Sequence, residues 1–173
     1  QVTVLKPAGE DITVTFTLLG DTLHGETGEV HTRTQDNLET WVAETAYTVD
    51  VNATVKDVLE LALKENGMTC SNPSGNYVES ITRNGVTLGE FDNGVSSGWM
   101  YTLNGVYPSL GVSQQYLESG DVIVFHYTDD YNVDWTTTED PAVTAVIGLI
   151  DAIGTPVTLE SEKAIVAARE AYD

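Results

Sequence analysis

The chain has 173 residues, of which 27 are acidic and only 7 are lysine or arginine, so its formal net charge is −20. Nucleic acids and anionic membranes would be repelled by such a field, because proteins bind phosphate groups chiefly through lysine and arginine. No stretch reaches the ~18 consecutive apolar residues that a membrane-spanning helix needs. We therefore expect no nucleic-acid partner and no membrane insertion, and the length predicts one domain plus a smaller segment.

The first predicted elements are two strands separated by a loop. Apolar residues from Ile12 to Leu18 alternate with threonines, which is the period of a strand with one buried face. Residues 20–37 contain glycines and many charged groups and are expected to form a long loop. Strand character returns over residues 41–49.

One amphipathic helix follows, and short strands come after it. Apolar residues recur at helical spacing from Val55 to Leu63, Thr54 is a candidate N-cap with Asp57 three residues later, and Gly67 is placed to end the helix. From residue 77 onward, three Asn-Gly pairs separate apolar stretches, and such pairs readily supply the positive φ angles of hairpin turns. This order predicts an α+β fold in which one helix crosses a small mixed sheet.

Five segments, in this order, resemble a known family: VTFTLLGD, ATVKDVLELALKENG, YVESITRNGV, SGWMYTLNGVYPSLG and LESGDVIVFHYTDDY. The family comprises bacterial surface domains whose fold is shared with the cobalamin-contacting C-terminal domain of transcobalamin and intrinsic factor. The resemblance implies a β-grasp-like domain over residues 10–130, of the kind found in soluble-ligand-binding modules. It also implies an extracellular location, at a bacterial cell surface or cell wall.

The C-terminal part is predicted to be separate. Residues 131–141 are acidic and threonine-rich, which is typical of a linker. Residues 142–173 show helical spacing in two stretches and resemble the first two helices of a repeat found in large Gram-positive surface proteins, in which a third helix follows. Two such helices alone would expose Ile147 and Ile165, among other apolar residues. We expect them to pair with a second copy as a homodimer, or else to pack on the first domain.

The candidate ligand-binding residues are Trp99, Tyr101, Asn104, Tyr107 and Pro108. Trp99 and Tyr101 fall on one face of a strand, and the others lie in the turn after it. The resemblance implies that this region approaches the corrin in transcobalamin-like domains, and aromatic planes also suit other flat molecules or sugar rings. The alternative is that Trp99 and Tyr101 are core aromatics of a small sheet. Corrinoid binding is expected to be weak at best, because the helical toroid that completes the cobalamin site of the animal proteins has no counterpart in this chain.

The expected function is that of a non-enzymatic module of a secreted or wall-attached bacterial protein. It would bind a small molecule, a glycan or a host macromolecule through the region from Trp99 to Pro108. A structural spacer with no ligand is one alternative, and a corrinoid half-site is another. No catalytic residue is predicted, since Cys70 is the single cysteine and no nucleophile elbow, zinc-protease helix or phosphate-binding glycine loop occurs.

The histidines raise the question of a metal. His24 and His31 share a loop with Asp21, Glu26 and Glu29, and imidazole with carboxylate is a ligand combination that Zn²⁺ accepts. A separation of seven positions between two histidines of a loop, however, matches no established zinc motif. The sequence therefore predicts no metal ligand and no cofactor other than the weak corrinoid contact.

A second polar run could supply oxygen ligands to Ca²⁺: Asp129, Asp130, Asn132 and Asp134. The run lacks the glycine and the terminal glutamate of an EF-hand loop, which excludes that motif. An irregular calcium site near Asp130 and a solvated linker are the two remaining interpretations.

Overall fold

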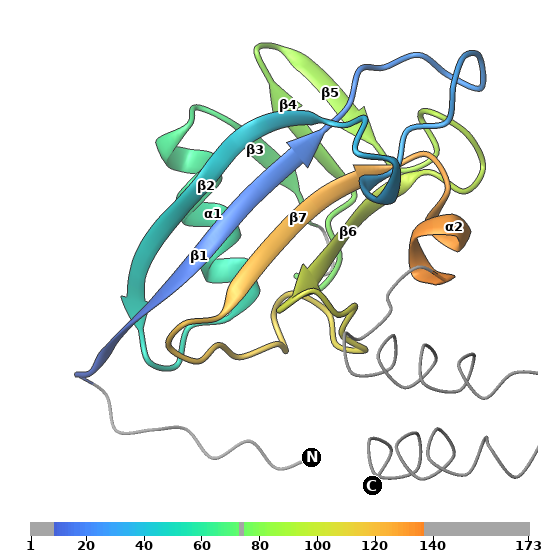
Figure 1. The fold of residues 1–173 in the computed structure, drawn as a ribbon. Helices are drawn as coiled ribbons and strands as arrows, with labels where there is room; N and C mark the ends of the chain where they lie inside the picture. The colour runs from blue at the N-terminus through green and yellow to red at the C-terminus, as the bar shows by residue number, and fades with distance from the viewer. Residues whose placement is uncertain (1–8, 73–74, 137–173) are drawn as a thin grey trace, which may run out of the picture. The chain divides into compact units, whose positions relative to one another are not determined.

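The structure is a computed structural model that describes residues 9–72 and 75–136 (Figure 1). Its helices and strands, in chain order, are β1 (Asp11–Gly20), the 3-10 helix η1 (Arg33–Gln35), β2 (Glu39–Asp50), α1 (Val55–Glu65), β3 (Thr69–Ser71), β4 (Ser80–Arg83), β5 (Val86–Gly89), β6 (Gly98–Leu103), β7 (Val122–Thr128) and α2 (Tyr131–Thr136). The expected α+β class is confirmed. No helix of the described part of the chain is both long and apolar enough to span a bilayer.

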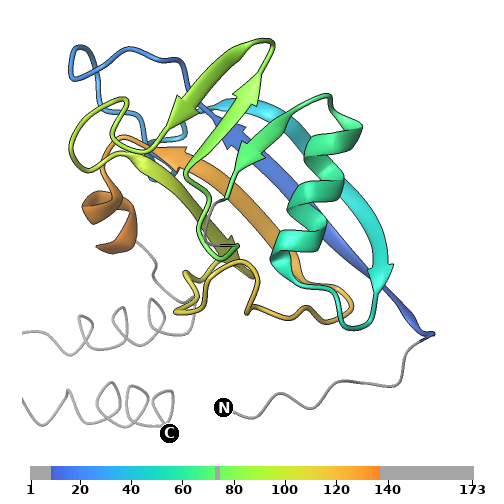
Figure 2. The same ribbon diagram turned by 180° about the vertical axis from the view of Figure 1, so that it is seen from behind.

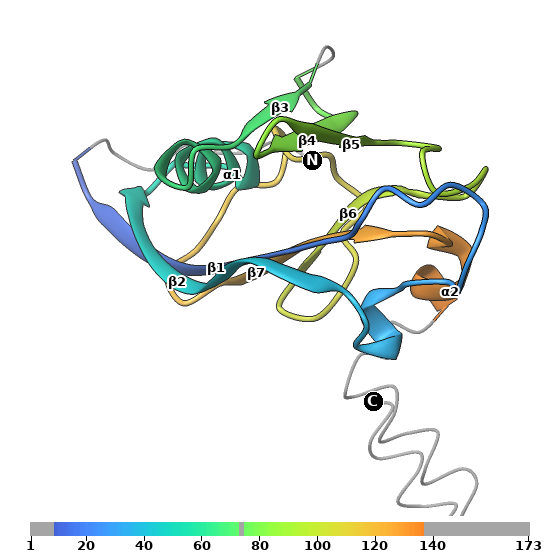
Figure 3. The same cartoon turned by 90° about the horizontal axis from the view of Figure 1, so that it is seen from above.

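The strands form two sheets. The larger one is mixed and has the order β2-β1-β7-β6, in which β1 and β7 are parallel and the other neighbours are antiparallel. The smaller sheet, β3-β4-β5, is antiparallel and was not expected as a separate unit. Figures 2 and 3 show α1 and the small sheet together on one face of the large sheet, and Figure 3 shows α2 on the opposite side. The main core therefore lies between these two layers.

The predicted periodicities explain the core. The apolar residues of β1 at alternate positions, from Ile12 to Leu18, are all buried. The face of α1 from Val55 to Leu63 is buried with them. The start of α1 is fixed by Asp57, whose carboxylate accepts hydrogen bonds from the backbone N–H of Thr54 and from its hydroxyl, both at 2.7 Å. Asn84 and Gly85 take φ angles of 52° and 80° and join β4 to β5, as the Asn-Gly signal predicts.

The parallel pair determines what lies at one end of the large sheet. β1 and β7 pair in parallel up to Leu19 and His126, so their carboxyl ends reach the same edge. Asp21 directly follows β1, and Asp129 directly follows β7. Residues about 100 positions apart in the sequence are thereby placed together, at the end where the loop after β1 begins (Figure 1).

The first part of the predicted linker is a helix instead. The backbone N–H of Tyr131 donates to the Ser96 carbonyl at 3.0 Å, and Asp134 is completely buried. The polar composition of these residues is typical of a linker and did not predict the helix. Asp134 lies inside the domain, 3.8 Å from His126, and not in solvent. Residues 137–141 of the predicted linker, the two helices predicted over residues 142–173 and the pairing expected of them lie outside the described residues.

Candidate functional site

A cavity of about 390 Å³ lies beside β6, which is the edge strand of the large sheet. Its walls come from β6, the segment before β4, the turn after β5, the segment after β6, and single residues of β7 and α2. They comprise Asn76, Tyr77, Val78, Phe91, Ser97, Gly98, Trp99, Met100, Tyr101, Tyr107, Pro108, Leu110, Gly111, Val112, Phe125 and Tyr131. None of these lining residues is an acid, a lysine, an arginine or a histidine.

Four of the five predicted ligand-binding residues line this cavity. Trp99 and Tyr101 are 5% and 9% exposed and belong to the core, as the alternative interpretation expects, and each also lines the cavity. Trp99 Nε1 donates to the Leu88 carbonyl at 2.9 Å, and the Tyr101 hydroxyl donates to the Leu110 carbonyl at 2.6 Å. Since their polar atoms are bonded within the protein, they offer a ligand chiefly ring surface.

Asn104 is not among the lining residues. It has a φ angle of 54°, and its amide donates to Asp121 at 2.8 Å while its side-chain oxygen accepts the backbone N–H of Val122 at 2.9 Å. These bonds close the turn of the β6 hairpin against the start of β7. Asn104 thus shapes the region without facing the cavity.

Tyr107 and Pro108 are partly exposed and form the rim of the cavity. The Tyr107 hydroxyl lies 2.8 Å from His126 Nε2, on the face of β7 that is turned away from the main core. Burial raises the pKa of Tyr101 and of Tyr107 to about 12, so both hydroxyls are neutral across the physiological range. The cavity wall is accordingly uncharged in a protein whose net charge is −20.

Phe91 is one of the lining residues that sequence reasoning did not select. Its φ angle is 65° and it is 60% exposed. A left-handed backbone conformation at a bulky residue other than glycine costs roughly 1–2 kcal/mol, and strained residues of this kind cluster at functional sites. An exposed aromatic ring in a strained turn beside a cavity marks that turn as a candidate contact.

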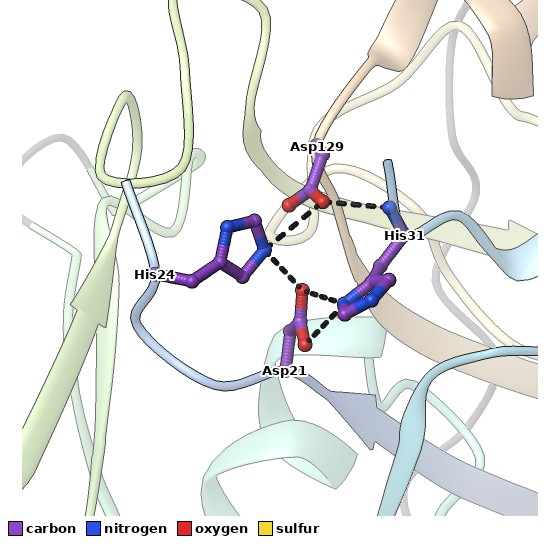
Figure 4. A group of neighbouring side chains, drawn as sticks. All are labelled: Asp21, His24, His31 and Asp129. Carbon is purple, nitrogen blue, oxygen red and sulfur yellow. Dashed lines mark hydrogen bonds and ion pairs between the residues drawn. The ribbon is translucent and has the colours of Figure 1, made fainter. Parts of the chain in front are cut away.

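A second group of functional side chains lies at the carboxyl ends of β1 and β7. Asp21, His24, His31 and Asp129 each offer one ligand atom, and these four atoms all lie within 4.8 Å of one another (Figure 4). His31 Nδ1 is 2.9 and 3.0 Å from the two carboxylate oxygens of Asp21. His24 Nε2 is 3.4 Å from Asp21 Oδ2 and 3.2 Å from Asp129 Oδ2.

This cluster joins two segments that are distant in the sequence, the loop after β1 and the residue after β7. The backbone N–H of His31 donates to Asp129 Oδ2 at 2.6 Å, and the backbone N–H of Asp129 donates to the His31 carbonyl at 2.9 Å. Burial lowers the pKa of His24, but the carboxylates of Asp129 and Asp21 outweigh it and raise that pKa above 6.5. Sequence reasoning considered both histidines but missed Asp129 as their partner, because only the parallel pairing of β1 with β7 brings it there.

The polar run after β7 is dispersed. Asp129 faces the two histidines, whereas Asp130 Oδ1 accepts the backbone N–H of Asn132 at 2.9 Å. Asp134 points into the protein near His126. Within residues 9–72 and 75–136, these oxygens therefore do not converge on one calcium-sized position.

Comparison with known proteins gives a family match over part of the chain. Residues 52–129, from before α1 to the end of β7 and its following residue, match the profile of the family described as Domain of unknown function (DUF4430). No match was found among curated proteins. The resemblance of the sequence to a domain family is thereby supported over that segment.

Two solved structures are similar at low identity. Haptocorrin in complex with Cbi has 19% identity and a TM-score of 0.48, covering 70% of this chain and 26% of the haptocorrin chain. A "putative metal binding protein" from Ruminococcus gnavus ATCC 29149 has 16% identity and a TM-score of 0.40, covering 69% of this chain and 99% of the other. This chain is thus similar to DUF4430 over residues 52–129 and spans about a quarter of the haptocorrin chain that it resembles.

Proposed function

We propose that this domain is a non-enzymatic binding module that takes a small, flat and largely apolar molecule into the cavity beside β6. The observation that carries the proposal is an uncharged cavity with many aromatic residues in its wall, in a chain with a net charge of −20. Its volume of about 390 Å³ falls within the range of roughly 300–1,000 Å³ that is typical of small-molecule sites.

The bonding of the wall favours an apolar ligand over a glycan. The polar atoms of Trp99, Tyr101 and Tyr107 already have partners inside the protein. The Tyr77 hydroxyl likewise donates to Glu90 at 2.8 Å. A sugar brings many hydroxyl groups, which would lose their hydrogen bonds to water without equivalent replacements here.

The strained turn at Phe91 argues against a spacer without ligand. A spacer gains nothing from a bulky residue at a φ angle of 65° that is 60% exposed, whereas a binding surface gains a ring beside its cavity.

A corrinoid is a large molecule, and the cavity would bury only part of its surface. Association also costs on the order of 4–15 kcal/mol in lost freedom of motion. We therefore expect corrinoid affinity to be weak.

The proposed setting is a secreted or wall-attached bacterial protein. The acidic composition, which suits solubility outside the cell, and the resemblance of the five segments to bacterial surface domains support this location. A host macromolecule would bind the surface around the cavity and not its interior, because the interior admits only small groups.

The test is titration of the chain with the neutral dye N-phenyl-1-naphthylamine, with a cello-oligosaccharide and with cobinamide as comparison ligands. We expect saturable binding of the dye, no oligosaccharide binding and weak cobinamide binding. Leu110→Glu places a charge at the cavity rim, where the side chain is 38% exposed, and should weaken dye binding at least tenfold. Val86→Glu adds the same charge at a 56% exposed apolar residue outside the cavity and is the matched control. Equal dye affinity in both variants would contradict the proposal.

A further inference from the structure

The cluster of Asp21, His24, His31 and Asp129 is separate from the cavity, with which it shares no lining residue. It combines two imidazoles with two carboxylates. Zn²⁺ binds such nitrogen and oxygen ligands, usually four of them, whereas Ca²⁺ and Mg²⁺ prefer oxygen ligands alone. The composition of the cluster therefore selects a first-row divalent metal ion over the alkaline-earth ions.

The two carboxylates of the cluster are buried, and one of their oxygens lacks a hydrogen-bond partner within the described part of the chain. Asp21 and Asp129 are only 6% and 7% exposed. Asp129 Oδ1 has no hydrogen-bond partner among the described residues, although it lies out of contact with solvent. Burying two neighbouring negative charges is unfavourable unless a cation or several hydrogen-bond donors accompany them. A divalent cation would neutralise both charges at once.

The position of His24 fits coordination better than hydrogen bonding. Its Nε2 lies between two carboxylate oxygens, at 3.2 and 3.4 Å, but makes a hydrogen bond with neither. Ligand atoms of a tetrahedral zinc ion lie about 3.3–3.4 Å apart when the bonds measure about 2.0–2.1 Å. The observed spacings of His24 are close to that value, and the largest spacing of 4.8 Å among the four atoms requires only a small inward movement.

Surrounding residues hold the ligands in place. Asn93 is 5% exposed, and its amide donates to Asp21 Oδ2 at 3.3 Å and to the Thr22 carbonyl at 2.9 Å. Its side-chain oxygen accepts the backbone N–H of His24 at 3.0 Å. Such outer contacts orient metal ligands and are a regular part of metal sites in proteins. A shallow cavity of about 250 Å³, bordered by His24 and Asp129, gives an ion a path from solvent.

We propose that Asp21, His24, His31 and Asp129 bind one Zn²⁺ ion in a structural site. Four protein ligands complete a tetrahedron, so no coordination position is left for substrate. The ion joins the loop after β1 to the end of β7 and thereby orders residues 21–31 against the large sheet. Its contribution is to the stability of this end of the domain.

The experiment uses the full chain without an affinity tag, stripped with a chelator and titrated with ZnCl₂ by calorimetry. We expect one Zn²⁺ per chain and a rise in Tm on loading. His24→Gln and His31→Gln should each weaken zinc affinity at least about tenfold. Loss of a residue that only supports a metal ligand already weakens metal affinity by roughly 10- to 100-fold, and loss of a ligand should cost no less. The matched control is Glu26→Gln with Glu29→Gln, which removes two exposed acids of the same loop that lie outside the cluster.

X-ray absorption of the zinc-loaded, unsubstituted chain provides a test that does not depend on a variant folding. We expect two imidazole ligands and no sulfur ligand. Three outcomes would each overturn the proposal. They are a failure to bind zinc, zinc binding that is lost only in the Glu26/Glu29 control, and an absorption spectrum that shows oxygen ligands alone. The dye titration of the cavity has a separate readout, so the two proposals can fail independently.

Discussion

His126 Nε2 lies 2.8 Å from the hydroxyl of Tyr107, and His126 Nδ1 lies 3.0 Å from the carbonyl oxygen of Tyr127. Since a carbonyl only accepts, Nδ1 carries the hydrogen and donates it, and Nε2 accepts from the Tyr107 hydroxyl. Both ring nitrogens are thus bonded in the neutral form. The imidazole has no exposed surface, and the rim of the cavity is connected through Tyr107 to the interior.

This arrangement predicts a loss of stability in mild acid. Burial lowers the pKa of His126 to about 4, against 6.5 in an unfolded chain. Between these pH values the unfolded state binds a proton that the folded state does not, so the free energy of unfolding falls as the pH falls. One such proton contributes at most about 1.4 kcal/mol per pH unit. Urea unfolding between pH 7 and 4.5 should show a steeper decline for the natural chain than for His126→Gln.

His24 contributes with the opposite sign, because its pKa is raised and protonation therefore favours the folded state. It is present in both proteins of that comparison, so the difference between the two slopes isolates His126. Equal slopes would show that His126 has the same pKa in the folded and the unfolded protein, so that burial does not lower it.

The N-terminus of α1 offers a second prediction. Asp57 accepts two hydrogen bonds from Thr54 at 2.7 Å, and this pair is the start signal that the sequence displays. Asp57→Ala should lower the free energy of unfolding by roughly 0.5–2 kcal/mol, the usual effect of losing a helix cap. Glu60→Ala, which removes only a surface ion pair with Lys56 at 3.6 Å, should change it by less than about 0.5 kcal/mol. Chemical denaturation of both variants checks the difference, and similar losses would contradict the capping role.

Elements that depend on neighbouring residues were predictable from the sequence. The alternation in β1, the cap and apolar face of α1, and the Asn-Gly turn between β4 and β5 are all encoded within a few residues. That Trp99, Tyr101 and Tyr107 gather at one cavity was also predictable, because they are close in the chain; ligand binding there stays a prediction.

Features that depend on contacts between residues distant in the sequence were not predictable. The loop of His24 and His31 becomes a metal-type cluster only because Asp129 lies beside it, across the parallel β1–β7 pair. The residues of α2 looked like a linker, since nothing near Asp134 in the sequence shows that His126 lies 3.8 Å away. Polar residues that are buried by long-range contacts have the same composition as solvated ones, which is why the linker was predicted to begin too early.

Gly20 illustrates another long-range constraint and gives a third prediction. A methyl group at this position would overlap the indole ring of Trp41 on β2. We expect Gly20→Ala to destabilise the domain by roughly 1–3 kcal/mol, as overpacking commonly does. In a Trp41→Ala background the same change should cost little, because the overlapping ring is gone. Gly98→Ala is the control, since its methyl group would meet Tyr77 at an ordinary 3.6 Å. An equal cost of Gly20→Ala in both backgrounds would exclude the overlap as its cause.

The last prediction separates stability from binding at Phe91. Its φ angle of 65° is tolerated by asparagine and is especially unfavourable for a β-branched residue. Phe91→Asn should therefore raise the free energy of unfolding, by up to about 1 kcal/mol, since a side chain that is 60% exposed loses little packing. Phe91→Val should lower it. Both variants remove the ring beside the cavity, so both should weaken binding of N-phenyl-1-naphthylamine. Paired urea unfolding and dye titration measure the two effects, and dye affinity that follows stability, with Phe91→Asn binding as tightly as the natural chain, would show that Phe91 has no part in the site.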